Sequence, residues 1–347
     1  MEYANYIAHC IELARKGEYY VAPNPMVGAV LVRNSDGKVL AEGWHEKYGE
    51  AHAEVNCFRH AESNIAKENG QCTKDFYKAC TLFVSLEPCS HYGKTPPCAK
   101  LIIEKGVGRV VVGMLDPNPL VAGRGVQMLR DAGIEVIVGV LENECRALNK
   151  RFLCLHEKHR PYVILKWAQT GDGFVDVRRD KGQGTKESAH LNGALAISTA
   201  ETKKLVHKMR AENMAIMVGT NTVLLDNPRL LNTHWEGRNP IRITIDRHNT
   251  IPQSARIFSD ETETIVYRER TDWPYITDDL GKRGIHSVLV EGGPTLIAHI
   301  LDSDIWDEIH IEVAPELRIG NGVAAPQIVL PTEYEVIDGH LLYTIVR

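Results

Sequence analysis

The sequence lacks the features that place a protein in a membrane or on nucleic acid. Nowhere in its 347 residues does an apolar run approach the roughly 18–20 residues needed to span a bilayer. The N-terminal segment lacks the basic start and the long apolar run of a secretion signal. The formal net charge is −5, and no basic patch with interleaved aromatic residues is visible. We therefore expect a cytoplasmic protein with no membrane and no nucleic-acid partner.

Without a secretion signal, the eight cysteines are not expected to form a disulfide framework, because a reducing compartment keeps thiols free. Metal binding or catalysis is then the alternative to consider for some of them. Cys10, Cys145 and Cys154 lie in segments with a helical pattern, and we interpret them as small buried hydrophobic residues. Cys89 and Cys98 differ, because each is next to a proline in the segment LEPCSHYGKTPPC.

Strand-like and helix-like segments alternate along the chain, which predicts an α/β protein. Hydrophobic residues make up 44% and charged residues 24%, as in ordinary globular proteins, and the length allows two domains. A charged helical connector over 141–161 separates a domain at 1–150 from one at 151–347. The polar stretch 177–193 is expected to be a mobile loop. Strands are expected at 27–34, 39–45, 81–87, 109–115, 134–140, 161–169, 214–219, 240–246, 262–268, 287–293 and 306–315. Helices are expected at 3–16, 52–68, 97–105, 123–132, 199–212 and 294–302.

A histidine, a glutamate and two cysteines form a candidate metal site. His52 and Glu54 stand two positions apart at the start of a predicted helix, and Cys98 follows two prolines that suit another helix start. A thiolate near a helix N-terminus is stabilised by the helix dipole. A structural zinc site normally has four protein ligands, whereas a catalytic site leaves one position for water. One imidazole and two thiolates therefore favour catalysis, with Glu54 moving protons as in zinc deaminases.

Simpler roles stay open for each of these residues. Taken alone, His52 would be a satisfied histidine at a helix start, and either cysteine would be a core residue. The main rival is a structural zinc site with His91, which lies between the cysteines, as a fourth ligand. The position of Glu54, which such a site would not need, argues against that rival.

Four segments of the first half resemble the bifunctional deaminase–reductase family of riboflavin biosynthesis. They are PNPMVGAVLV (23–32), EGWHEKYGEAHAEVNC (42–57), LEPCSHYGKTPPC (86–98) and DPNPLVAGRG (116–125). The resemblance implies an N-terminal cytidine-deaminase-like α/β/α domain and a C-terminal dihydrofolate-reductase-like α/β domain. It also implies zinc-dependent deamination of 2,5-diamino-6-ribosylamino-4(3H)-pyrimidinone 5′-phosphate, a small-molecule substrate. Reduction of the ribosyl group to ribityl with NADPH would follow.

Carried over residue by residue, the resemblance implies that His52, Cys89 and Cys98 bind Zn²⁺ and that Glu54 is the catalytic proton shuttle. The implied substrate contacts of the deaminase are Asn24, His45, Lys94 and Asn118. Asparagine can present both a donor and an acceptor to a pyrimidine edge, and lysine offers positive charge to a phosphate. The neighbouring prolines leave a turn role open for the two asparagines. The segment 62–80 looks longer than is usual in the family, and we expect a surface excursion there.

The second half resembles the reductase of the same family less closely. The matching segments are 161–173, 209–230 and 290–301. In the last of these, Gly292 and Gly293 let the backbone approach a ligand, and Pro294 suits the start of a helix whose N-terminus favours phosphate. The implied NADPH contacts are Ala168, Thr222, Asp226, Gly293, Pro294 and Thr295. The implied substrate contacts are Lys166, Arg210, Leu230 and Glu291.

Two departures from the family pattern fall in this half, at residues 190–199 and at Thr233. They affect the expected site for the substrate phosphate, and we expect Arg210, Arg229 or Arg238 to compensate. The alternative function is a deaminase alone, with a C-terminal half that serves structure or oligomerisation. A zinc-stabilised protein without enzymatic activity is a third possibility. The resemblance further implies a homo-oligomer, a dimer or tetramer, formed through the reductase domain.

Overall fold

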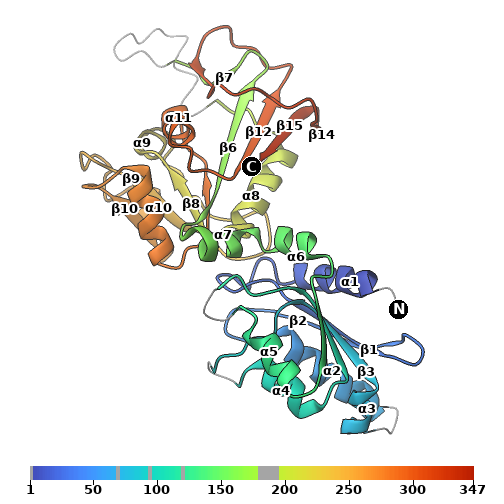
Figure 1. The fold of residues 1–347 in the computed structure, drawn as a ribbon. Helices are drawn as coiled ribbons and strands as arrows, with labels where there is room; N and C mark the ends of the chain where they lie inside the picture. Colours follow the sequence, from blue (N-terminus) through green and yellow to red (C-terminus); the bar gives the residue numbers. More distant parts are fainter. Residues whose placement is uncertain (1–2, 68–70, 93–95, 119–121, 179–194) are drawn as a thin grey trace. The chain divides into compact units, whose positions relative to one another are not determined.

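The computed structural model describes residues 3–67, 71–92, 96–118, 122–178 and 195–347, and Figure 1 shows their helices and strands. The chain forms two compact units, Met1–Lys158 and His159–Arg347. The division follows Lys158 and not residue 150, because Leu153 of helix α7 (Lys150–Lys158) packs into a core cluster of the N-terminal unit. Most of the loop predicted at 177–193 lies outside the described residues.

Five strands form the sheet of the N-terminal unit, in the order β2–β1–β3–β4–β5. In that order they span Val39–Trp44, Gly28–Arg33, Cys80–Leu86, Arg109–Met114 and Glu135–Val138. Strand β1 is antiparallel to β2 and to β3, whereas β3, β4 and β5 are parallel to one another. Every residue of β3 is buried, as expected for a strand that is covered on both faces.

Helices cover both faces of this sheet. They are α1 (Tyr3–Arg15), α2 (Ala53–Lys67), α3 (Lys74–Lys78), α4 (Cys98–Lys105), α5 (Arg124–Asp131), α6 (Glu142–Leu148) and α7. Neighbouring residues of β1 point to opposite faces, so that Leu31 packs with α2, α4 and α5, whereas Val32 packs with α1 and α6. The unit is therefore an α/β/α sandwich. Cys10, Cys145 and Cys154 are buried with free thiols, as predicted.

The segment 62–80 is more than a surface excursion, and that part of the prediction is wrong. Tyr77 of α3 is buried, and its ring packs edge-on against Phe58 of α2 with 5.5 Å between the ring centroids. The hydroxyl of Thr73 accepts a hydrogen bond from the Phe76 backbone N–H and caps this short helix. The capped helix thereby adds aromatic side chains to the N-terminal core.

Eight strands form the main sheet of the C-terminal unit, in the order β10–β9–β8–β11–β6–β12–β15–β14. In that order they span Thr264–Tyr267, Ile241–Ile245, Ala215–Val218, Ser287–Val290, Tyr162–Thr170, Glu308–Ala314, His340–Val346 and Glu335–Ile337. Pairing is parallel from β10 to β12 and antiparallel from β12 through β15 to β14. A separate pair joins β7 (Phe174–Asp176) to β13 (Val323–Ala324).

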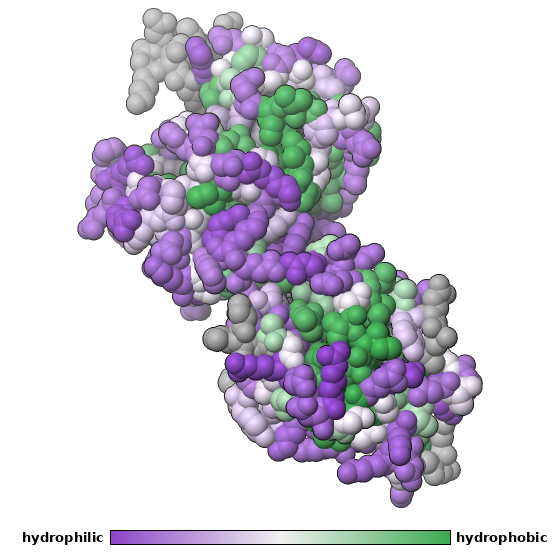
Figure 2. Space-filling view, in the orientation of Figure 1, coloured by the Kyte–Doolittle hydropathy of each residue, from purple (hydrophilic) through white to green (hydrophobic). Residues whose placement is uncertain are grey.

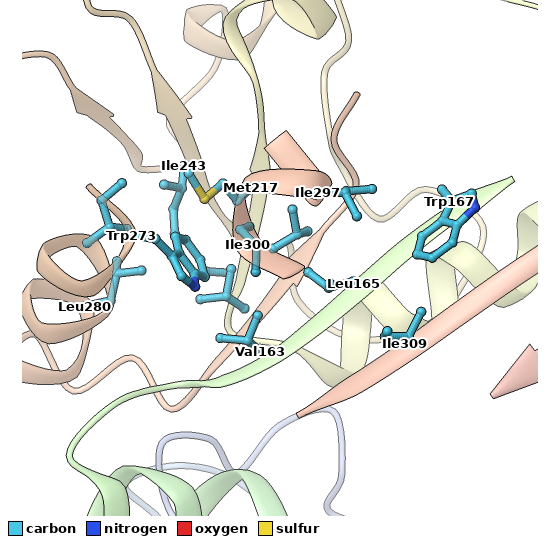
Figure 3. Packing of buried hydrophobic residues seen from close by; sticks show 14 of the residues in the cluster. Val163, Leu165, Trp167, Met217, Ile243, Trp273, Leu280, Ile297, Ile300 and Ile309 are labelled. Carbon is cyan, nitrogen blue, oxygen red and sulfur yellow. The ribbon is translucent and has the colours of Figure 1, made fainter. Parts of the chain in front are cut away.

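Four α-helices are described in this unit: α8 (Ala200–Glu212), α9 (Thr220–Asp226), α10 (Trp273–Lys282) and α11 (Pro294–Ser303). The last three pack hydrophobic side chains against the parallel strands. Figure 3 shows Trp273 of α10 and Ile300 of α11 in the same buried cluster as Val163 of β6 and Met217 of β8. This core holds the parallel strands in place, and the residues predicted for the reductase lie at the carboxyl ends of these strands.

None of the helices in the described part of the chain combines the length and the hydropathy that crossing a bilayer requires. Hydrophilic residues make up most of the viewed face of each unit in Figure 2, and smaller hydrophobic areas interrupt them. Tyr334, Val336 and Val346 are exposed apolar residues in or beside β14 and β15, at the edge of the C-terminal sheet.

Candidate functional site

The three predicted metal ligands come from separate parts of the N-terminal unit and meet at one point. His52 directly precedes α2, Cys89 follows β3, and Cys98 is the first residue of α4. His52 Nδ1 lies 3.7 Å from Cys89 Sγ and 3.5 Å from Cys98 Sγ. Among the residues that the structure describes, these three form a group whose ligand atoms all lie within 4.8 Å of one another. His91, the fourth ligand of the rival hypothesis, is exposed and outside this group.

The start of helix α4 favours a thiolate at Cys89. Pro97 is the N-cap residue of α4, and the Cys98 backbone N–H donates a hydrogen bond to Cys89 Sγ at 3.3 Å. A hydrogen bond from the Cys98 thiol lowers the pKa of Cys89 well below its ordinary value, against the effect of burial. The same bond, together with burial, raises the pKa of Cys98. These opposite shifts favour a thiolate at Cys89, and metal binding would release the proton of Cys98.

This donor set fits zinc. One imidazole nitrogen and two sulfurs are donors that Zn²⁺ prefers, and three protein ligands leave one tetrahedral position for another molecule. Glu54 lies in the first turn of α2, is 3% exposed and stands outside the ligand group, as expected of a proton carrier. Burial raises the pKa of Glu54 to about 6, so that its carboxyl group can take up and release a proton near neutral pH.

Two of the predicted deaminase substrate contacts lie beside the metal ligands. Asn24 Nδ2 donates to His45 Nε2 at 3.1 Å, and His45 Nδ1 donates to the backbone oxygen of Ala51 at 3.0 Å. Burial lowers the pKa of His45, which keeps its ring neutral with Nε2 as an acceptor. The rings of His45 and His52 are 5.5 Å apart between their centroids. The ring of His45 therefore lies between Asn24 and His52, which is one of the three predicted metal ligands.

The other two predicted contacts have different outcomes. Lys94 lies outside the described residues. Asn118 lies in the segment after β4, where its backbone N–H donates a hydrogen bond to Asp116 Oδ1 at 2.8 Å. This bond forms a local turn, the alternative role that its neighbouring prolines suggested. The role of the Asn118 side chain as a substrate contact stays a prediction.

The buried carboxylate of Glu87 holds that segment in place, and Glu87 is not among the residues predicted from the sequence. Glu87 Oε2 accepts the backbone N–H groups of Asp116 at 3.1 Å and Gly123 at 2.9 Å. Glu87 Oε1 accepts the N–H of Val126, at the start of α5, at 3.1 Å. Glu87 follows β3 and precedes Pro88 and Cys89, so it joins the cysteine loop to the segment of Asn118. The sequence signal that could have identified Glu87 is its position directly before Pro88 and the predicted ligand Cys89.

A cavity of about 910 Å³ lies in the C-terminal unit at the carboxyl ends of the parallel strands. Ligands bind at this edge in parallel α/β sheets. Eight predicted residues line the cavity: Lys166, Ala168, Thr222, Asp226, Glu291, Gly293, Pro294 and Thr295. The structure thus gathers most of the predicted reductase residues around one space.

The N-terminus of helix α11 opens on this cavity. Gly293 is its N-cap residue and Pro294 its first residue, the position where proline costs no hydrogen bond. A Cβ atom on Gly292 would lie 2.9 Å from Leu296 Cδ2, so the Leu296 side chain would have to move to admit a side chain there. The dipole of a helix makes its N-terminal end favourable for an anionic group.

Arg210 and Leu230 are described but do not line the cavity. Arg210 Nε and Nη2 donate to the two carboxylate oxygens of Glu291 at 2.9 and 2.7 Å. Burial would raise the pKa of Glu291, but Arg210, Lys166 and His207 lower it below its ordinary value. Leu230 is buried in a small cluster that includes Val223 of α9. Arg210 therefore holds the lining residue Glu291, and Leu230 packs in the same cluster as Val223 of α9, although neither residue lines the cavity itself.

The arginines expected to compensate for the departures at 190–199 and Thr233 are also absent from the described lining. Arg229 is half exposed and lies 4.0 Å from an Asp260 carboxylate oxygen. Arg247, which follows strand β9, is instead the only arginine among the described lining residues. It was not predicted, because nothing in the local pattern of RITIDRHN marks a ligand site.

Comparisons with known proteins cover both units. Residues 1–114 match the family of the cytidine and deoxycytidylate deaminase zinc-binding region, and residues 161–331 match the RibD C-terminal domain. A riboflavin biosynthesis protein RibD from Aquifex aeolicus is 37% identical over 92% of this chain and 88% of its own. The solved structure of Acinetobacter baumannii RibD is 30% identical, with a TM-score of 0.84, and covers 99% of this chain and 98% of its own.

A second solved structure, from Thermotoga maritima, is described as a diaminohydroxyphosphoribosylaminopyrimidine deaminase and 5-amino-6-(5-phosphoribosylamino)uracil reductase. It is 35% identical, has a TM-score of 0.81, and covers 99% of this chain and 98% of its own. These matches confirm the predicted fold, a cytidine-deaminase-like unit followed by a dihydrofolate-reductase-like unit. The chain belongs to the RibD family of bifunctional deaminase–reductase proteins of riboflavin biosynthesis.

Proposed function

We propose that the chain catalyses two successive reactions on a pyrimidine ribose phosphate. The first is hydrolytic deamination of 2,5-diamino-6-ribosylamino-4(3H)-pyrimidinone 5′-phosphate, and the second is NADPH-dependent reduction of the ribosyl group to ribityl. The meeting of His52, Cys89 and Cys98 next to the buried acid Glu54 is the observation that carries the deaminase. Family membership connects that site to this substrate class.

In the deaminase, His52 Nδ1 and the thiolates of Cys89 and Cys98 would hold zinc. Bound zinc supplies Lewis acidity that makes water a nucleophile near neutral pH. Glu54 would take the proton of that water and deliver it to the departing amino group, which leaves as ammonia. Its pKa of about 6 suits both steps, because the carboxyl group is then partly ionised near neutral pH. Burial of Glu54 also keeps bulk water from competing for the proton.

Asn24, His45, Lys94 and Asn118 would position the substrate for this step. His45 Nδ1 is committed to the backbone of Ala51, so Nε2 stays an acceptor on the side that faces Asn24. Asn24 in turn keeps a side-chain oxygen that can accept from an amino group of a pyrimidine. Lys94 would offer its charge to the substrate phosphate.

In the reductase, NADPH would occupy the cavity of the C-terminal unit and supply the hydride. The first turn of α11 would bind a cofactor phosphate through the backbone N–H groups of Gly293 and Thr295, and Pro294, which has no N–H, would fix the shape of the turn. Ala168, Thr222 and Asp226 would complete the cofactor contacts. Lys166 and Glu291 would hold the substrate, with Arg210 fixing the Glu291 carboxylate. Such a charged cavity would serve no purpose in the alternative function, where the C-terminal unit has lost its activity.

The two activities can be tested on one purified chain. Zinc and NADPH stoichiometry is measured first, and then ammonia release and NADPH oxidation are followed with the diaminopyrimidine substrate. We expect about one zinc per chain, ammonia release without NADPH, and NADPH oxidation only after deamination. Ammonia release without NADPH oxidation, in a chain that binds no NADPH, would favour the alternative.

Assembly and location complete the proposal. We expect a homo-oligomer, a dimer or tetramer, that associates through the C-terminal unit. Exposed Val336 and Val346 lie at an edge of its sheet, where unpaired strands are protected by association. Light scattering on the full chain and on a Val336→Lys variant tests this. A cytoplasmic location would keep the cysteine ligands reduced.

A further inference from the structure

A row of charged and polar side chains crosses the C-terminal sheet beside the cavity. Glu291 follows strand β11, Lys166 lies on β6, Glu312 on β12 and His340 on β15, and these strands are neighbours in the sheet. Glu312 pairs with Ala168 in register, two positions beyond Lys166, so Glu312 and Lys166 point to the same face. Lys166 and Glu291 line the cavity, whereas Glu312 and His340 are not among its described lining residues.

Glu312 is buried and uses both oxygens of its carboxylate. Its residue surface is 2% exposed. Oε2 accepts a hydrogen bond from Ser198 Oγ at 2.6 Å and lies 3.6 Å from Lys166 Nζ. Oε1 accepts from His340 Nδ1 at 2.8 Å. One carboxylate thereby connects a cavity-lining cation, a cavity-lining hydroxyl and the C-terminal strand β15.

The contacts of Glu312 with Lys166 and Ser198 compensate for the cost of burying its charge. Burial would raise the pKa of Glu312, but the charge of Lys166 and the hydroxyl of Ser198 lower it below its ordinary value. An ionised carboxylate 3.6 Å from Lys166 Nζ restricts the flexible lysine side chain to one orientation. Ser198 directly precedes Thr199, the N-cap of helix α8, so the same carboxylate also fixes the segment 195–198 of the cavity wall.

We propose that Glu312 is a positioning residue of the reductase, which orients the ammonium group of Lys166 and the hydroxyl of Ser198 toward the substrate. This inference rests on the proposed reductase function. Glu312 acts through Lys166 and does not touch the substrate. A displacement of about 1 Å in a substrate-holding group costs roughly 10²-fold in rate, which sets the scale of the expected effect.

The test uses the full-length, zinc-loaded chain and four variants: Glu312→Gln, Lys166→Met, the double variant and Ser198→Ala. Glu312→Gln keeps the shape of the side chain and removes its charge. We expect it to lower reductase kcat/KM by about 10²-fold, while the dissociation constant for NADPH and the rate of ammonia release stay unchanged. Ser198→Ala removes one hydrogen bond and is expected to have a smaller effect. Glu335→Gln, on the exposed edge strand β14, is the matched control.

The double variant separates positioning from a structural role. If Glu312 acts mainly through Lys166, adding Glu312→Gln to Lys166→Met costs no more activity than the small loss expected for Ser198→Ala. Equal losses in both backgrounds, or a full reductase rate in Glu312→Gln, would overturn the proposal. Should Glu312→Gln fail to fold, which loss of NADPH binding would reveal, Ser198→Ala alone and combined with Lys166→Met gives the same comparison. An unaltered chain that binds NADPH without oxidising it would contradict the proposed function itself.

Discussion

Asn149 makes two hydrogen bonds to the backbone of Met26, which is 123 positions away in the chain. Its Oδ1 accepts the Met26 N–H at 2.8 Å, and its Nδ2 donates to the Met26 carbonyl at 2.9 Å. Asn149 is 3% exposed, and Met26 lies two residues after Asn24. The end of α6 therefore holds the segment that brings Asn24 to the candidate deaminase site.

We expect Asn149→Ala to lower the free energy of unfolding of the N-terminal unit by about 2 kcal/mol, because two partly buried backbone groups of Met26 lose their partners. Affinity for the deaminase substrate should fall as well, since Asn24 loses its support. Urea denaturation and the substrate KM measure these effects. Asn64→Ala, which removes a single side-chain bond to the Leu40 carbonyl, is the control. An Asn149→Ala variant as stable as the control would show that the two hydrogen bonds between Asn149 and Met26 do not hold this segment.

Glu54→Gln tests the proton carrier. The variant should keep its zinc, because Glu54 is not in the ligand group, and should release ammonia about 10²–10⁴-fold more slowly. Reductase activity on an already deaminated substrate should not change. Glu62→Gln, on the same helix but half exposed, is the matched control. Metal analysis together with ammonia release decides the matter, and undiminished ammonia release from a zinc-loaded Glu54→Gln variant would exclude the assignment.

Removing a metal ligand should lower zinc binding as well as ammonia release. Cys98→Ser removes the sulfur that lies 3.5 Å from His52 Nδ1 at the start of α4, so the variant should bind less than one zinc per chain and release no ammonia. Its NADPH binding should persist, because the cavity lies in the other unit. Atomic emission for zinc and fluorescence titration with NADPH give both values. Zinc retained at full stoichiometry in Cys98→Ser would point to a different ligand set.

The Arg210–Glu291 pair predicts a pH dependence of stability. The pKa of Glu291 is lower in the folded chain than its ordinary value, so the pair stabilises the fold fully above the unfolded value of about 4.3. As the pH falls through the lower folded pKa, Glu291 becomes protonated and this contribution is lost. Glu291→Gln should therefore lower the Tm of the C-terminal unit by about 5 °C at pH 7, and the difference should shrink toward pH 3. A difference that stays constant with pH would argue against the ion pair as its source.

Arg247 is expected to discriminate between the two nicotinamide cofactors. It lines the cavity just after the carboxyl end of β9, and an arginine near the ribose can accommodate the 2′-phosphate that distinguishes NADPH. Arg247→Ala should raise KM for NADPH by about tenfold, as expected for one lost charge-assisted bond, and leave KM for NADH nearly unchanged. Arg268→Ala, which alters an exposed arginine outside the lining, is the control. Equal effects on both cofactors would show that Arg247 does not read the phosphate.

Local patterns in the sequence predicted most strands and helices, and one missed helix had a readable signal. Helix α10 begins with Asp272 as an N-cap, whose side chain accepts the Tyr275 N–H, and has Pro274 in its first turn. The strands β14 and β15 were not predicted, although β15 is antiparallel to β12 and places His340 next to Glu312. The pairing of β15 with β12 joins separate parts of the chain and has no local signal. Strands β14 and β15 instead form a hairpin in which Ile337 pairs with His340 across Asp338-Gly339, and this two-residue turn was a readable signal that the prediction missed.

The sequence by itself determined which residue types could bind a metal and move a proton, because the spacing of His52, Glu54, Cys89 and Cys98 is a local property that chemistry limits to few uses. Tertiary structure alone decided which residues support that chemistry. Glu87, Asn149 and Glu312 act on partners far away in the chain, and Arg210 and Leu230 lie behind the cavity and not at its surface. A hydrogen bond between distant segments depends on how the sheets and helices pack, which no short stretch of residues records.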